Sequence, residues 1–183
     1  MVELNSKKLK ISYLNLKAVK NSLVYVQNET YKRKDDSFLK AIGFPYIGEL
    51  SKDRKKFVDT KIDLMVQSIE ELIIIGLVAD FEKIVFDRVS NASGEISKIV
   101  KMKYTAEPFK NFSTDFVKSV KEIDKLSVVK SIISNKLPEE LLLKFSEIID
   151  FRNRLAHGKR FGEQSIMSFD DIAKILDDVL NYV

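Results

Sequence analysis

The residues best suited to chemistry lie together near the C-terminal end of the sequence. His157 is the only histidine in 183 residues, and it follows Arg152 by five positions. Lysine supplies most of the positive charge of the chain, yet three of its six arginines are Arg152, Arg154 and Arg160. A guanidinium is planar and permanently charged, which suits it to oxyanions, and an imidazole exchanges protons near neutral pH. Together with Gly158, a residue type that commonly ends helices, this pattern indicates a site for phosphate chemistry.

Arg152 continues the apolar row Leu141, Phe145 and Ile148 by one helical step, so we expect it on the core side of its helix. A charge in that position needs a partner, because an unpaired buried charge is very costly. Glu82 is the predicted partner, since its own helical neighbours are apolar. Two interpretations stay open: a structural ion pair, or a guanidinium that lines a cleft and binds a phosphate.

Residues 152–158, Arg-Asn-Arg-Leu-Ala-His-Gly, resemble the Arg-(x4–6)-His motif of the HEPN superfamily in its R-N-x-x-A-H-G form. That superfamily consists of small all-α domains, many of which are metal-independent endoribonucleases of toxin–antitoxin and antiphage systems. The chain looks most like the stand-alone HEPN proteins of the RiboL-PSP-like branch. As in HEPN domains, a glycine-containing loop (158–167) leads from the motif to a final amphipathic helix.

The resemblance implies a catalytic pair, Arg152 and His157, that works without a metal or a cofactor. The 2′-hydroxyl of RNA would attack the adjacent phosphate, and His157 would transfer protons. Arg152 would stabilise the charge that develops on the phosphoryl oxygens. The expected products are a 2′,3′-cyclic phosphate and a 5′-hydroxyl.

The resemblance also implies supporting residues. Asn153 matches the polar residue after the arginine, where it would orient His157 or hold substrate; it could equally be a helix-end hydrogen-bonding residue. Glu82 matches an acid that these domains carry on an early core helix. The RNA-binding candidates are cations that would otherwise be ordinary solvated side chains: Arg154, Lys159 and Arg160.

The partners implied by the resemblance are RNA, a second copy of the chain and an antitoxin protein. HEPN enzymes commonly pair two motifs across a dimer interface, so we expect a homodimer with one composite cleft. Two alternatives stay open. One is a non-catalytic HEPN-fold module that binds RNA, nucleotides or proteins, and the other is a helical structural protein whose Arg152–Glu82 pair belongs to the core.

The composition narrows the classes of protein. A length of 183 residues with 45% hydrophobic content predicts a single domain spanning residues 1–183 with a substantial core. The absence of cysteine excludes disulfides and thiolate metal sites. The N-terminus has no signal-peptide pattern, and the longest apolar run (72–79) is too short to span a bilayer. We therefore expect a soluble, cytoplasmic protein. The net charge of +4 is spread along the chain and by itself indicates only a solvated basic surface.

Apolar spacing predicts an all-α, HEPN-like helical bundle with five or more helices and a long central helix. The predicted helices cover residues 4–27, 51–89, 113–135, a stretch that begins at Pro138 and leads into the motif, and a last helix that begins after a Ser168/Asp171 capping box.

The helix predicted over residues 51–89 would be longer than a small domain is wide. We expect it to bend, to break near Gly76, or to protrude and contribute to a dimer. Its segment 72–86 is apolar nearly all round, which is typical of a buried central helix. Residues 41–48 are predicted to form a loop and residues 91–94 a turn, while residues 95–111 carry no clear pattern.

Overall fold

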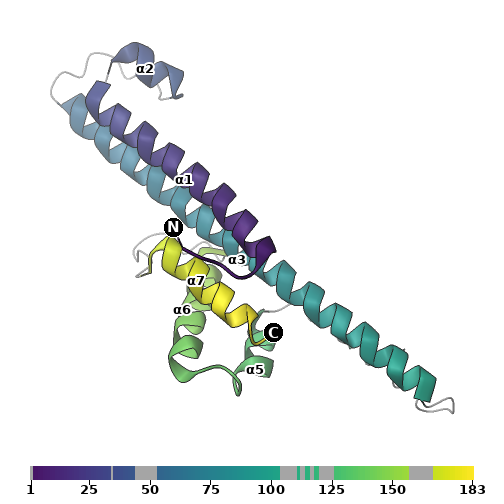
Figure 1. The fold of residues 1–183 in the computed structure, drawn as a ribbon. Coiled ribbons are helices and arrows are strands. Elements are labelled where there is room, and N and C mark those ends of the chain that lie inside the picture. The colour runs from purple at the N-terminus through teal and green to yellow at the C-terminus, as the bar shows by residue number, and fades with distance from the viewer. Residues whose placement is uncertain are drawn as a thin grey trace. The chain divides into compact units, whose positions relative to one another are not determined.

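The computed structural model describes residues 2–33, 35–43, 53–103, 111, 114–115, 118–119, 126–156 and 167–183. Within these residues the protein is all-α, without any strand, which confirms the predicted fold class. The helices are α1 (Lys7–Arg33), α2 (Asp36–Ala41), α3 (Asp53–Lys103), α5 (Leu126–Ile133), α6 (Glu139–Ala156) and α7 (Phe169–Leu180) (Figure 1). No helix in this described part of the chain is both long enough and apolar enough to cross a membrane.

The chain divides into two compact units. One, here called the motif unit, combines Met1–Ser12 with Leu77–Val183. The other, the hairpin unit, is Tyr13–Gly76. Because α1 and α3 each contribute to both units, neither unit is a simple terminal half of the sequence. The expectation of a single domain stays a prediction.

In the hairpin unit, α1 and α3 lie side by side and run antiparallel (Figure 1). Gln27 donates to Asp63 at 2.8 Å and the Lys20 ammonium lies 3.2 Å from Glu70, so higher numbers on α1 meet lower numbers on α3. Buried apolar residues from α2 and α3 form a small core with Ile42 against it: Leu39, Val58, Ile62 and Val66.

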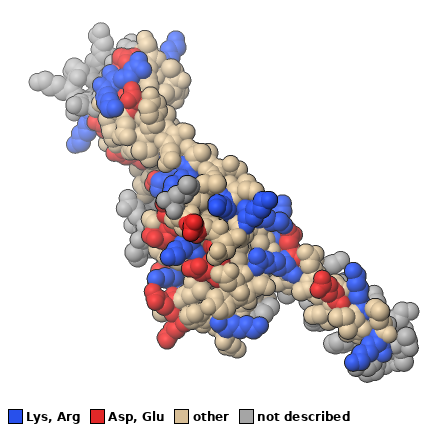
Figure 2. Space-filling model, in the orientation of Figure 1, with Lys and Arg blue, Asp and Glu red and all other residues tan. Residues whose placement is uncertain are grey.

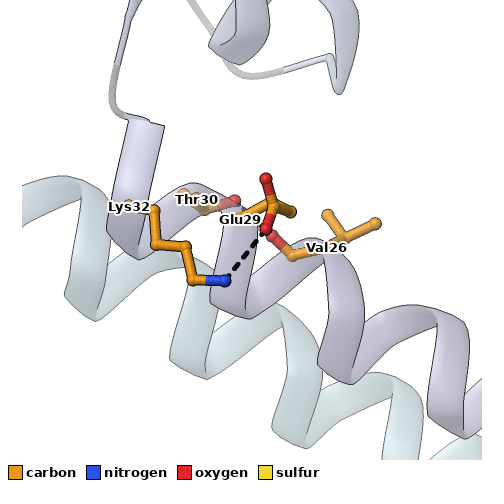
Figure 3. A network of polar contacts seen from close by, with 4 residues as sticks. All are labelled: Val26, Glu29, Thr30 and Lys32. Atoms are coloured by element: carbon orange, nitrogen blue, oxygen red, sulfur yellow. Dashed lines mark hydrogen bonds and ion pairs between the residues drawn. The ribbon is translucent and has the colours of Figure 1, made fainter.

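Helix α1 extends past the predicted end near residue 27 to Arg33. The buried Thr30 hydroxyl donates to the Val26 carbonyl oxygen at 2.7 Å, and Lys32 pairs with Glu29 at 3.2 Å (Figure 3). These local contacts satisfy the polar side chains within the helix. The prediction ended this helix too early because the polar segment resembles a connector.

The core of the motif unit is built around the first turns of its share of α3. The Phe81 and Phe145 rings meet edge to face, with centroids 5.6 Å apart and planes at 69°. Helices α6 and α7 pack against each other. The fully buried apolar residues here include Leu77, Val78, Phe81, Val85, Phe145, Ile148, Ile172 and Leu176. Within the predicted buried segment 72–86, one side of α3 is therefore buried, while Leu72 remains 55% exposed.

Helix α3 is continuous at the two places where the sequence suggested an interruption. A break near Gly76 was one of three alternatives and does not occur, and the predicted turn at residues 91–94 is wrong. The helix passes through Gly76, where an added Cβ would lie 3.7 Å from a Leu16 methyl carbon, which is ordinary contact. It also passes through residues 91–94, and the buried Ser93 hydroxyl is satisfied by the Ser90 carbonyl oxygen at 2.8 Å. A mid-helix glycine costs only about 1 kcal/mol relative to alanine, which the flanking helical residues outweigh.

The start signals of the last two long helices are confirmed. Helix α6 begins directly after Pro138, whose carbonyl oxygen accepts from the Leu142 amide at 2.9 Å. At α7, the Asp171 amide donates to Ser168 Oγ at 3.1 Å, as the capping box requires. Helix α5 ends at Ile133, close to the predicted residue 135. The predicted cap was residue 113 or Thr114; residue 113 lies outside the described residues, and Thr114 is helical.

Helix α2 was not predicted. Asp35 caps it by accepting from the Phe38 amide at 2.8 Å, and Gly43 follows it with a positive φ of 77°. The helix ends at Ala41, where the predicted loop begins, and residues 44–48 of that loop lie outside the described residues.

A carboxylate on α7 holds the N-terminal segment of the chain. Asp177 is 2% exposed and accepts from the backbone amides of Asn5 at 2.6 Å and Ser6 at 2.8 Å. These amides lie at the start of α1, where helical N–H groups lack intrahelical partners. The Arg88 guanidinium donates to the Leu180 carbonyl oxygen, three residues after Asp177, so both contacts hold the C-terminal end of α7.

Candidate functional site

Helix α6 carries the candidate site at its C-terminal end. Glu139 and Glu140 occupy its first turn, where acids complement the helix dipole. Phe145 and Ile148 face the core and are buried, so the helix is anchored along one side. Arg152 continues that side into the last turn, before the helix ends at Ala156.

Arg152 reaches Glu82 on α3, as predicted. Its Nη2 lies 3.2 Å from each of the two carboxylate oxygens of Glu82, and the contact with Oε2 is a hydrogen bond. The Glu82 side chain is 15% exposed and that of Arg152 is 36% exposed. The carboxylate is thus sheltered from water, whereas a substantial part of the guanidinium remains accessible.

The surroundings of Glu82 explain why it needs a cation. Its helical neighbours Val78, Phe81 and Val85 are fully buried. A carboxylate beside such side chains is poorly hydrated, and an opposite charge with good geometry offsets that cost. The ion pair therefore joins α3 to the end of α6 in the motif unit.

The contact with Glu82 does not use all the hydrogen-bond donors of the Arg152 guanidinium. Glu82 meets a single nitrogen end-on, instead of pairing two oxygens with two nitrogens side by side. A guanidinium carries more N–H donors than its contacts with Glu82 and Asn153 use. Arg152 can therefore keep its carboxylate partner and still donate to the oxygens of an anion on its accessible side.

Asn153 also contacts Arg152. Its Oδ1 accepts a hydrogen bond from Arg152 Nη1 at 3.2 Å, and its side chain is half-buried. The sequence pattern predicts that Asn153 orients His157, holds substrate or makes hydrogen bonds at the helix end, but it does not predict this contact with Arg152. Adjacent helical residues do not face each other, and the contact depends on how the long arginine side chain folds.

The other candidates are placed only in part. His157, Gly158, Lys159 and Arg160 lie outside the described residues, so their predicted roles stay predictions. Arg154 lies exposed in the last turn of α6. The structure thus brings Arg152, Glu82 and Asn153 together directly before the position of His157 in the chain.

A groove of about 640 Å³ lies beside the first half of α6. Its lining combines apolar and charged side chains of α6 and α7, including Leu141, Ile175, Lys144 and Asp178. Neither Arg152, Glu82 nor Asn153 lines it, so the groove is distinct from the candidate site. Among the described residues, no group of three His, Cys, Asp or Glu side chains is placed to hold a metal ion.

The charged side chains of the described residues are mixed on the face shown in Figure 2. Lysine and arginine side chains are interspersed with acidic side chains on this face. A net charge of +4 on such a surface carries little information about a partner. A ligand is therefore indicated by the local chemistry of Arg152 and not by the overall charge.

Comparisons with known proteins provide no relative from which a function could be inferred. No protein-family model matches the chain, and no curated protein or solved structure matches it significantly.

Proposed function

We propose that this chain is a metal-independent endoribonuclease of the HEPN type, with Arg152 and His157 as its catalytic residues. The observation that carries the proposal is the arrangement of Arg152. Its guanidinium is held by Glu82 on one nitrogen, is 36% exposed, and has donors left for an anion. The only histidine of the chain follows within five residues, one position after the end of α6.

The proposed reaction is an internal transfer of the phosphoryl group. The 2′-oxygen of the RNA forms a bond to the adjacent phosphorus while the bond from phosphorus to the 5′-oxygen breaks. The proton of the 2′-hydroxyl leaves to a base, and the departing 5′-oxygen gains a proton. The nucleophile is the substrate's own hydroxyl, so the reaction needs no metal-bound water.

The two catalytic residues have separate tasks in this reaction. His157 exchanges protons near neutral pH, which suits it to either transfer. The Arg152 N–H donors stabilise the charge that builds up on the phosphoryl oxygens. Glu82 does not touch the substrate; it keeps Arg152 in place. Arg154, Lys159 and Arg160 contribute phosphate contacts, which add affinity without reading the sequence.

The proposal includes a homodimer that brings two copies of the motif to one cleft. A reaction with two proton transfers could then draw on both histidines. The biological setting of such an enzyme is bacterial defence or toxin–antitoxin growth control, with an antitoxin protein as a further partner.

The decisive experiment incubates the purified protein with total RNA in the presence of EDTA, beside the His157→Ala variant. We expect the unmodified protein to produce fragments with 2′,3′-cyclic phosphate and 5′-hydroxyl ends, and the variant to produce none. Mass spectrometry of the fragment ends distinguishes this reaction from contaminating metal-dependent nucleases.

Other outcomes reject the assignment in different ways. If the unmodified protein and His157→Ala cleave RNA equally well, His157 is not catalytic. If the protein binds RNA but does not cleave it, the chain is a non-catalytic binding module. If it does neither, the Arg152–Glu82 pair is best explained as core architecture.

A further inference from the structure

The Arg152 guanidinium is held at two nitrogens by two different residues. Glu82, on α3, meets Nη2 at 3.2 Å. Asn153, the next residue on α6, accepts from Nη1 through its Oδ1, also at 3.2 Å. The two partners approach from separate helices and engage separate atoms of one planar group.

We propose that Asn153 is a positioning residue that acts through Arg152, and that its hydrogen bond fixes the plane in which the guanidinium meets a phosphodiester. This inference rests on the proposed function, since a phosphodiester is the ligand that Arg152 would receive. It assigns Asn153 a role different from direct contact with substrate or with His157.

The need for a second anchor follows from the geometry of the first. Both oxygens of Glu82 lie at the same distance from one nitrogen, Nη2. Such an end-on contact fixes the position of that nitrogen but lets the rest of the guanidinium swing around it. A side-by-side pair would have fixed the plane by itself. The hydrogen bond from Nη1 to Asn153 removes the remaining rotation.

The chemistry of the Asn153 oxygen supports the same role. Oδ1 is an acceptor, and a phosphodiester oxygen offers only lone pairs to it. The oxygen therefore cannot bind an anion, but it can align the donor group that does. Orientation is worth much in such a reaction, since a misplacement of about 1 Å can cost ~100-fold in rate.

The first test needs no RNA. In nitrogen-15 spectra of the arginine side chains, a guanidinium held at Nη1 and Nη2 gives separate Nη proton signals, because rotation about its C–N bonds is hindered. Asn153→Ala should merge or broaden the Arg152 signals. Asn153→Asp, which keeps an acceptor, should preserve them. Arg88, whose Nη1 donates to the Leu180 carbonyl oxygen, is the internal reference and should not change.

The second test measures turnover. Asn153→Ala should lower kcat by about 10- to 100-fold and change KM by less than about threefold, since alignment acts mainly in the transition state. In an Arg152→Lys background the same substitution should change kcat by less than about twofold, because an ammonium has no plane to align.

The outcomes separate this inference from the proposed function. If Asn153→Ala leaves the Arg152 signals unchanged, Asn153 does not position Arg152, whether or not RNA is cleaved. An equal loss of kcat in both backgrounds would likewise overturn the inference. If the unmodified protein cleaves no RNA, the proposed function fails, and the spectra alone decide whether Asn153 fixes the guanidinium.

Discussion

At the scale of single residues, we expect the Arg152–Glu82 ion pair to stabilise the folded protein. Arg152→Ala leaves the sheltered Glu82 carboxylate without its cation, and we expect a loss of about 1–3 kcal/mol in the free energy of unfolding. Glu82→Gln should cost less, because the amide oxygen still accepts from the guanidinium. Urea denaturation measures both. Lys8→Ala is the matched control, because it breaks an exposed ion pair: the Lys8 side chain is 72% exposed and that of its partner Asp87 is 51% exposed. This substitution should cost less than about 1 kcal/mol. An unchanged midpoint for Arg152→Ala would show that the pair is not part of the core.

The sequence predicted this pair because both residues break an otherwise apolar helical face, and a charge in such a place calls for a partner. It could not predict the Asn153 contact, since helical spacing carries no information about how a long side chain folds onto its neighbour. It also missed Asp177, although the clue was present. That acid lies at helical spacing from the buried Ala173 and Leu180, as Glu82 does among its own apolar neighbours.

At the scale of helices, Asp177 links the end of the chain to its beginning. Asp177→Ala would leave the amides of the exposed Asn5 and the half-buried Ser6 without their carboxylate acceptor. Water can partly replace that acceptor, so we expect each lost hydrogen bond to cost about 1 kcal/mol. We expect faster amide hydrogen exchange at residues 5 and 6 and a lower denaturation midpoint. Asp177→Asn should lose less, because one oxygen remains. Unchanged hydrogen exchange at both amides in Asp177→Ala would show that Asp177 does not hold the N-terminal segment.

A second prediction at this scale concerns the contact between α1 and α3 in the hairpin unit. The Tyr31 hydroxyl donates to the Asp63 carboxylate, and this hydrogen bond, with some burial, raises the pKa of Tyr31 above its ordinary 10.0. The raised pKa contributes stability that is complete below the unfolded value and is lost as pH rises through the folded value. Asp63→Asn should lower the Tyr31 pKa toward 10.0, as measured by titrating its ring signals. Asp87→Asn is the control and should leave the Tyr31 pKa unchanged. If the Tyr31 pKa in Asp63→Asn equals that of the unmodified protein, the hydrogen bond to Asp63 is not the cause of the raised value.

Helix boundaries were predictable where side chains cap the helix and less so elsewhere. The Ser168/Asp171 cap and the Pro138 start reveal themselves in the sequence because the capping atoms lie on those residues. The end of α1 and the passage of α3 through residues 91–94 depend instead on local polar contacts and on burial. Serine and glycine there indicate a turn only when nothing else favours the helix.

At the scale of the whole molecule, the predicted dimer would need exposed apolar side chains to bury. The apolar segment 72–86 suggested more hydrophobic surface than one chain can bury. Most of it is buried within the single chain, including Leu77, Phe81 and Val85 at 0% exposure. Leu72, at 55%, is the large apolar residue of that segment that remains exposed. Farther back on α3, other apolar side chains are exposed as well: Phe57, Leu64 and Met65.

The homodimer therefore stays a prediction, and Leu72 is where it is best tested. Light scattering should give about twice the 21.1 kDa of one chain at tens of micromolar protein. Leu72→Glu should weaken the dimer by about tenfold or more, because it places a charge where an apolar side chain would be buried. Ile99→Glu, at a position 62% exposed farther along α3, is the matched control and should leave the mass unchanged. A monomeric mass for the unmodified protein at this concentration would refute the dimer, and with it the idea that two motifs share one cleft.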